Sequence, residues 1–376
     1  MAAPLYDIRP VDGHIHMSLC RRMSRYCNIR HMLDILDSCG LEAINIQNIV
    51  LWQTRNLVRN PLSLLAKATG GERVYSFGGP RYPLPGDPPD PADLRRQAEE
   101  LMALGFDGIK LFGKPDMRHE SSLAFDSPFF DEMFGYLEET GTPTLFHVGD
   151  PLSFWDREKI PQFAIDNGWY YDGSYEPAEQ LYTEIDHVME RHPKLNIIFP
   201  HVYFLSDDLP RLAAFLDRWE NVKTDITPGI EMYDSFTANA EASHDFFVKY
   251  ADRIFFGTDN TGNAANQEGE DYVARSAGVI RSMREFLETD GTVQSSWGAE
   301  LQGIALPLET AKKIYRDNFY AFAGAKPQPV DLSRAAAYTE ERLFEAKRRE
   351  EEGRTEHCPE VIPEIEQTLA HFRRLS

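Results

Sequence analysis

The chain of 376 residues is 42% hydrophobic and 12% aromatic, which is enough for a sizeable core in one large domain or two ordinary ones. Its 39 basic and 60 acidic side chains give a net charge of −21, which argues against nucleic-acid binding through a broad basic surface. No apolar run approaches the roughly 20 residues of a membrane span, and residues 1–16 show no signal-type segment. The cysteines show no paired spacing that would indicate a disulfide framework or a zinc site. We therefore expect a cytoplasmic protein with free thiols.

Eight short apolar runs follow one another along the chain, each succeeded by a polar or helix-forming stretch. They are residues 8–17, 41–49, 73–79, 106–113, 142–150, 195–202, 221–227 and 253–260. Several are apolar without alternation, as expected of parallel strands buried on both faces. The intervening helical stretches that close at Gly40, Gly105 and Gly141 place a glycine at the expected C-cap. This order over about 260 residues predicts an α/β fold, a (β/α)8 TIM barrel.

The C-terminal part of the chain has a different composition. Residues 326–376 are rich in Glu, Arg and Lys, and Pro327 and Pro329 separate them from the preceding helical stretch. We therefore expect a barrel domain over residues 1–325 and a helical C-terminal extension over residues 326–376, which covers the barrel or a neighbouring subunit of a homo-oligomer. Partial disorder is the alternative for so charged a segment.

Metal-type side chains stand at the ends of several predicted strands. His14 and His16 form a His-x-His pair, and His147, His201 and Asp259 end three later strands. Because side chains alternate along a strand, both imidazoles of the pair lie on one face. In a parallel barrel the C-terminal ends of the strands converge on the active site. Metal-dependent chemistry is therefore the leading interpretation, and two structural histidines are the alternative for the pair.

At these residues the chain resembles the amidohydrolase superfamily, in particular the branch of amidohydrolase-2 and aminocarboxymuconate-semialdehyde-decarboxylase-like enzymes. The resemblance spans roughly residues 8–324. Its motifs are VDGHIHM, LFHVGDP, PKLNIIFPH, RIFFGTDN and the closing stretch NFYAFAG. Each motif is short and weakly specific, but the order of all of them along separate strands is characteristic.

The resemblance implies that His14, His16, His147 and Asp259 bind one divalent ion, with zinc expected first and manganese or iron as alternatives. It also implies that His201 lies beside the ion. There His201 or Asp259 would act as general base on a water that the ion activates.

Two positions depart from the family pattern or are ambiguous. His201 is followed by Val202, Tyr203 and Phe204 where the family carries small residues, which weakens a decarboxylase assignment and makes Tyr203 a candidate for the substrate pocket. Lys110 ends the fourth strand. A carboxylated lysine that bridges two metals stays open there, beside a cation for a substrate carboxylate and a salt bridge in the barrel mouth.

Arginines and aromatic residues follow several strands. Arg21, Arg22 and Arg81 are our candidates for binding an anionic substrate, since the guanidinium group recognises carboxylates through its planar fork. Solvated loop positions are the alternative for these arginines. The long loop after the fifth strand is unusually aromatic and contains Trp155, which we expect in a lid or pocket wall or, alternatively, in a subunit contact.

The leading functional hypothesis is a metal-dependent hydrolase that acts on an amide, a lactone or a C–C bond of a small carboxylate-bearing substrate. A non-oxidative metal-dependent decarboxylase on the same barrel is the second hypothesis. A non-catalytic metal- or ligand-binding protein is the third. The fold itself does not decide among the three.

Overall fold

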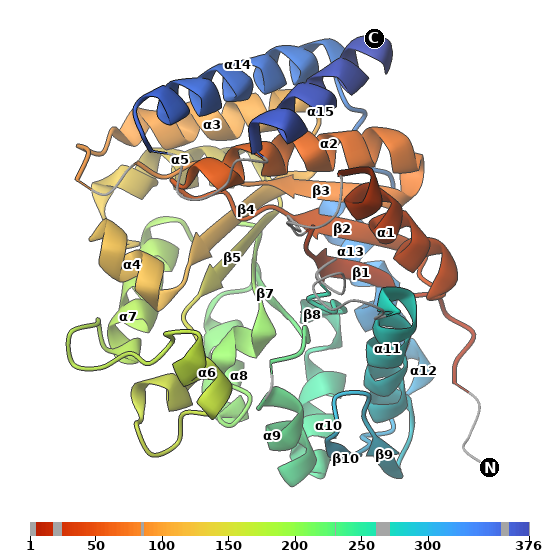
Figure 1. Ribbon diagram of the computed structural model, residues 1–376. Coiled ribbons are helices and arrows are strands. Elements are labelled where there is room, and N and C mark those ends of the chain that lie inside the picture. Colours follow the sequence, from red (N-terminus) through yellow and green to blue (C-terminus); the bar gives the residue numbers. More distant parts are fainter. Residues whose placement is uncertain are drawn as a thin grey trace.

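The computed structural model describes residues 5–17, 25–83, 86–229, 231–260, 271–354 and 361–375. Eight parallel strands lie side by side in sequence order, as the sequence predicts for a (β/α)8 barrel (Figure 1). They are β1 (Val11–Ile15), β2 (Ala43–Gln47), β3 (Val74–Gly78), β4 (Gly108–Gly113), β5 (Thr144–Val148), β6 (Ile197–Phe199), β7 (Val222–Asp225) and β8 (Ile254–Phe255). Almost every residue of these strands is buried, because helices cover their outer faces.

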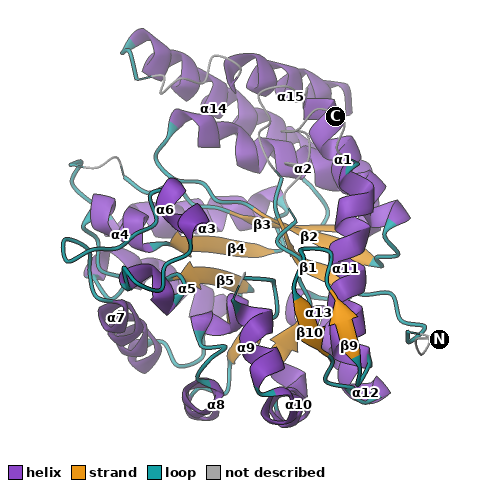
Figure 2. Ribbon diagram, turned by 60° about the horizontal axis from the view of Figure 1, so that its bottom comes forward, coloured by secondary structure: helices purple, strands orange, loops and turns teal. Residues whose placement is uncertain are grey.

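Helices surround the strands in the alternating order that the sequence predicts (Figure 2). Several begin at an acidic cap, since the side chains of Asp90 and Asp271 accept hydrogen bonds from the first turns of the helices that follow. The helices are α1 (Arg25–Ser38), α2 (Arg59–Gly70), α3 (Pro91–Leu104), α4 (Pro115–Ser121), α5 (Pro128–Thr140), α6 (Gln162–Asp166), α7 (Ala178–Arg191), α8 (Leu209–Arg218), α9 (Met232–Ala238), α10 (Ala240–Lys249), α11 (Tyr272–Glu288), α12 (Leu308–Lys312), α13 (Asn318–Ala323), α14 (Leu332–Glu351) and α15 (Val361–Leu375).

Backbone hydrogen bonds join the last strand region to the first. The Gly13 amide donates to the Phe256 carbonyl at 2.9 Å, and the His16 amide donates to the Asn260 carbonyl at 2.9 Å. At the end where the strands begin, Phe319 of α13 packs edge-on against Tyr75 of β3, with ring centroids 5.0 Å apart. The barrel is therefore filled at this end, and its polar interior lies toward the carboxyl ends of the strands.

The C-terminal extension is helical, as predicted. Helices α14 and α15 form a hairpin that packs on α2 and α3 (Figure 1). The Asn60 amide donates to the Tyr338 hydroxyl at 3.1 Å, and Arg349 donates to the Trp52 carbonyl at 2.5 Å. These bonds connect the hairpin to α2 and to the loop that follows β2. The domain boundary at residue 325 remains a prediction.

One element was not predicted from the sequence. Strands β9 (Thr292–Gln294) and β10 (Glu300–Gln302) form a short antiparallel hairpin after α11. Its five-residue connection contains Trp297, whose ring lies 5.4 Å from that of Tyr233. Within the described ranges of the chain, no helix is long and apolar enough to cross a membrane.

Candidate metal centre

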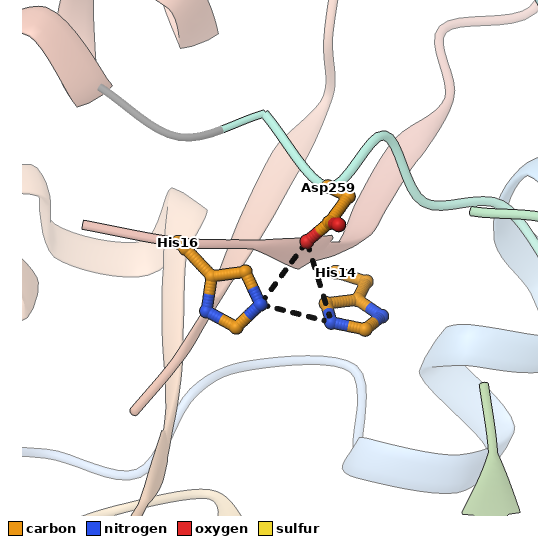
Figure 3. Close-up of side chains that lie close together, drawn as sticks. All are labelled: His14, His16 and Asp259. Atoms are coloured by element: carbon orange, nitrogen blue, oxygen red, sulfur yellow. Dashed lines mark hydrogen bonds and ion pairs between the residues drawn. The ribbon is translucent and has the colours of Figure 1, made fainter. Parts of the chain in front are cut away.

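The side chains of His14, His16 and Asp259 meet at one point at the barrel mouth (Figure 3). The two Nε2 atoms lie 3.1 Å apart, and an oxygen of Asp259 lies 3.1 Å from His16 Nε2 and 3.9 Å from His14 Nε2. His14 lies on β1, His16 directly follows it, and Asp259 follows β8, so the closure of the barrel brings the three side chains together. Both histidines are buried, whereas the Asp259 side chain is 38% exposed.

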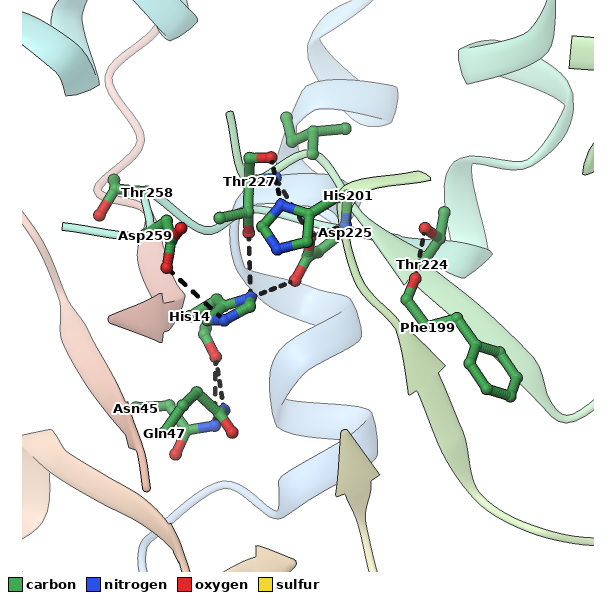
Figure 4. Close-up of polar contacts among 12 residues, drawn as sticks. His14, Asn45, Gln47, Phe199, His201, Thr224, Asp225, Thr227, Thr258 and Asp259 are labelled. Atoms are coloured by element: carbon green, nitrogen blue, oxygen red, sulfur yellow. Dashed lines mark hydrogen bonds and ion pairs between the residues drawn. The ribbon is translucent and has the colours of Figure 1, made fainter. Parts of the chain in front are cut away.

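Hydrogen bonds at the opposite ring nitrogens fix both imidazoles. His14 Nδ1 contacts the carboxylate of Asp225 at 2.8 Å (Figure 4), and His16 Nδ1 contacts the Gln47 carbonyl at 2.8 Å. Because a carbonyl oxygen only accepts hydrogen bonds, His16 Nδ1 carries a proton, and the Asp225 carboxylate requires the same of His14. In neutral rings both Nε2 atoms are then unprotonated acceptors that face the Asp259 carboxylate. Such a group of acceptors suits a cation.

The pKa values of His14, Asp225 and Asp259 agree with a neutral His14 ring and two ionised carboxylates. Burial lowers the pKa of His14 to about 4, with a further contribution from Lys110. Burial raises the pKa of Asp225, but the charge and hydrogen bond of His14 outweigh that effect and leave it at about 2. Burial raises the pKa of Asp259, but the hydrogen bond and charge that a His16 ring protonated at both nitrogens supplies exceed this effect, so the pKa lies below the usual range and the carboxylate is ionised. Two imidazoles and one carboxylate are a ligand set that zinc accepts.

The segment that carries Asp259 is held by a buried carboxylate and a glycine. Asp12 accepts hydrogen bonds from the Thr258 hydroxyl at 2.6 Å and the Thr258 amide at 3.0 Å. At Gly257 a Cβ atom would lie 2.5 Å from the Thr227 hydroxyl and 2.7 Å from the His14 Cβ. Any larger residue would therefore displace the strand end that positions Asp259.

His201 reaches the site through an unusual backbone turn. His201, Val202, Tyr203 and Phe204 have φ angles from +46° to +57°, a left-handed region that costs about 1–2 kcal/mol per residue other than glycine. The His201 amide donates to Asp225 at 2.8 Å, and its Nδ1 contacts the Thr227 carbonyl at 3.1 Å (Figure 4). Its ring centroid lies 5.4 Å from that of His14. The turn therefore directs the ring of His201 toward the metal centre.

His147 lies next to this centre but outside the converging group. Its ring centroid is 5.0 Å from that of His201, and its Nε2 contacts the Gly149 carbonyl at 3.1 Å. Burial, followed by the neighbouring His201, lowers the pKa of His147 well below the ordinary value, so its ring is neutral. Of the four ligands expected from the sequence, the structure brings together three and places the fourth beside them.

Lys110 is a buried amine in the barrel interior. It lies on β4, is 2% exposed, and its Nζ has no hydrogen-bond partner among the described residues. Burial lowers its pKa to about 7, against the opposing effects of Asp259 and Asp225. A buried amine without a partner is costly unless a ligand satisfies it.

A family model described as amidohydrolase matches residues 79–322, well over half of the sequence. The chain belongs to this amidohydrolase family. Its members are metal-dependent, in agreement with the convergence of His14, His16 and Asp259. No curated protein matches the sequence.

Solved structures resemble this chain in fold. A 4-oxalomesaconate hydratase from Rhodopseudomonas palustris is 12% identical, with 89% of this chain and 99% of the hydratase covered and a TM-score of 0.51. A 2,6-dihydroxybenzoate decarboxylase from Rhizobium is 17% identical, with 84% of this chain and 98% of the decarboxylase covered and a TM-score of 0.48. The likeness to the hydratase supports the barrel fold and does not identify a reaction.

The described arginine and tryptophan candidates for substrate binding are engaged in contacts within the protein. Arg21 and Arg22 lie outside the described residues. Arg81 forms an ion pair with Glu345 of α14 at 2.5 Å, so a substrate carboxylate would have to compete for its guanidinium. The Trp155 indole donates to the Glu176 carbonyl at 3.0 Å within the loop after β5. That loop packs its own aromatic side chains into a small core, so a structural role accounts for Trp155.

Tyr203 is buried in the layer between the barrel and the outer helices. Its ring stacks on Phe215 of α8 at 4.9 Å and packs edge-on against Tyr182 of α7 at 4.9 Å. The left-handed turn explains this orientation, because it directs His201 inward and Tyr203 outward. The side chain therefore supports the turn instead of lining the metal centre.

Asp225, which contacts the ring of His14 and the backbone amide of His201, was not predicted from the sequence. It ends β7, and one carboxylate bonds to His14 and to the His201 amide. An aspartate at the carboxyl end of a predicted barrel strand was a usable signal. Gln47 could not be identified in the same way, since it acts through its backbone carbonyl.

Proposed function

We propose that this amidohydrolase is a metal-dependent hydrolase of a small, carboxylate-bearing substrate, with the ion held by His14, His16 and Asp259. The observation that carries the proposal is the convergence of three acceptor atoms whose histidine protons are directed away from the meeting point. A divalent ion bound there would polarise a carbonyl group and lower the pKa of a water molecule. Zinc is our first choice for this ion, and manganese or iron is the alternative.

His147 is the fourth ligand in this proposal. To join the other three residues, its Nε2 would have to give up the Gly149 carbonyl. The ring already lies against His201 and is neutral, as a metal ligand must be.

His201 is the proposed proton acceptor. Its Nδ1 donates to the Thr227 carbonyl, which leaves Nε2 with a lone pair. The Asp225 carboxylate holds both the His201 backbone and the His14 ring, so the proton acceptor is fixed relative to a metal ligand. Lys110 would bind the substrate carboxylate, which would satisfy its buried amine.

Decarboxylation is the second candidate, and Lys110 is the observation that favours it. A second cation at the barrel interior can hold a carboxylate group while the C–C bond to that group breaks, and a His201 ring that carries a proton on both nitrogens would transfer the Nε2 proton to the carbon that loses carbon dioxide. The two reactions differ in the use of water. Reaction in ¹⁸O-labelled water incorporates the label into the product of hydrolysis, whereas decarboxylation releases carbon dioxide that can be trapped.

Metal analysis tests the proposed centre. We expect about one ion per chain in the wild-type protein and almost none in the variant with His14→Ala and His16→Ala. A control variant with His119→Ala and His187→Ala removes two half-exposed histidines from the surface and should keep the ion. The circular dichroism spectra of the wild type, the His14/His16 variant and the control variant should agree, because the barrel core is unchanged. Full metal content in the His14/His16 variant would overturn the site and leave a non-catalytic role open.

A further inference from the structure

A pocket of about 210 Å³ opens beside the metal centre and reaches outward between the segments after β7 and β8 and helix α11. Asp259 forms part of its wall, so the pocket is continuous with the proposed ligands. Gly229 lies on one side, and Trp297 of the β9–β10 hairpin contributes on the outer side. A molecule held at Asp259 can therefore extend into this pocket.

One face of α11 forms the long wall of the pocket. Tyr272, Arg275, Ser276 and Val279 follow the i, i+3, i+4, i+7 spacing of a single helical face. Seven helical steps at about 1.5 Å per residue give a wall about 10 Å long. The wall presents an aromatic ring, a cation and an aliphatic side chain in succession.

The aromatic side chains of the pocket are fixed by their neighbours. The Tyr272 hydroxyl donates to Asp34 at 2.6 Å, and its ring lies 3.7 Å from the ring of His31. Trp297 packs edge-on against Tyr233, with centroids 5.4 Å apart, and is 36% exposed. A ligand ring would meet surfaces that are already ordered, which reduces the entropy cost of binding.

We propose that this pocket binds the distal half of the substrate, a planar ring with a second carboxylate that Arg275 recognises. The inference rests on the proposed metal-dependent function, because it assigns the reacting half of the substrate to the Asp259 end. A dry cavity of about 150 Å³ accommodates benzene, so a pocket of about 210 Å³ is of the right size for one substituted ring. Tyr272 and Trp297 provide faces for the ring.

Charge supports the assignment of the second carboxylate. The chain carries a net charge of −21, so an anion needs a local cation to approach its surface. Arg275 lines the pocket on α11, away from Lys110 on β4. The two cations would therefore bind two separate anionic groups of one substrate, which selects dicarboxylates over monocarboxylates.

Calorimetric titration of the zinc-loaded protein with the three benzene dicarboxylate isomers and with benzoate tests this inference. We expect at least one dicarboxylate to bind more tightly than benzoate, and Arg275→Gln to weaken its binding about tenfold or more, the value of a charge-assisted contact. Arg281→Gln is the matched control, because Arg281 lies on the same helix, pairs with Glu285 and is 73% exposed. Its affinities should equal those of the wild type. Trp297→Leu should reduce the preference for a benzene dicarboxylate over the corresponding cyclohexane dicarboxylate.

The outcomes separate this inference from the proposed function. If the ion is present and Arg275→Gln binds every probe as the wild type does, the pocket assignment is wrong and the metal centre stands. The same conclusion follows if no dicarboxylate binds at about 10 mM, a concentration that detects even millimolar affinity. If the protein takes up no zinc but a dicarboxylate still binds in an Arg275-dependent manner, the function fails and the pocket stands.

Discussion

Replacement of the buried amine on β4 should stabilise the protein while removing its activity. Lys110→Met keeps a long side chain of similar shape and removes a charge that has no hydrogen-bond partner in the described part of the chain. Lys110 is 2% exposed, so solvent does not screen that charge. We therefore expect a gain in stability that depends on pH in a defined way.

The size of the gain follows from the pKa of Lys110. Burial lowers it from 10.5 to about 7, and at about 1.4 kcal/mol per pKa unit the charged form destabilises the folded state by about 3–5 kcal/mol below pH 7. Between pH 7 and pH 10.5 the unfolded chain binds a proton that the folded chain has released, so wild-type stability rises with pH across this window. The gain in folding free energy from Lys110→Met should be full at pH 6 and fall to about 1.4 kcal/mol at pH 9.5.

Thermal unfolding of chelator-treated protein measures this difference. An unfolding entropy of about 0.8 kcal/mol/K for 376 residues converts the gain at pH 6 into a rise in Tm of about 4–6 °C. Lys67→Met is the matched control, because Lys67 is equally buried but pairs with Asp107 at 2.5 Å. That variant leaves a buried carboxylate without its partner and should lose stability. A Lys110→Met protein that melts below the wild type at pH 6 would refute the reasoning.

Three further changes separate the roles at the metal centre and its surroundings. His201→Asn should retain the ion, since asparagine tolerates the left-handed backbone. Its turnover number should fall by a factor of about 10²–10⁴. Loss of the ion in metal analysis would instead make His201 a ligand. Asp225→Asn should weaken zinc binding about 10–100-fold in chelator competition, because it releases the ring of His14, and unchanged affinity would contradict that role. Arg81→Ala should lower Tm by about 1–2 °C through loss of the pair with Glu345. A selective rise in KM for a charged substrate over its neutral analogue would instead place Arg81 in the substrate site.

Features with a short sequence period were predictable, and features that depend on side-chain direction were not. The eight strands follow from apolar runs, and the His14/His16 pair follows from alternation along β1. The direction of Tyr203 depends on four successive left-handed residues, which no local pattern of large side chains predicts. The engagement of Arg81 depends on Glu345, 264 residues later in the chain. Such long-range pairing is set by the docking of α14 and not by the loop that carries Arg81.

The left-handed turn and Asp225 together explain how the site keeps its geometry. Four left-handed residues at about 1–2 kcal/mol each would cost several kcal/mol without compensation. Burial of Val202 and Tyr203 offsets part of this cost. The Asp225 carboxylate also stabilises the turn, because it accepts a hydrogen bond from the His201 amide at 2.8 Å. The same carboxylate contacts the ring of His14 at 2.8 Å. A change at Asp225 should therefore release the strained turn and the metal ligand together, so that ion affinity and proton transfer are lost as one unit.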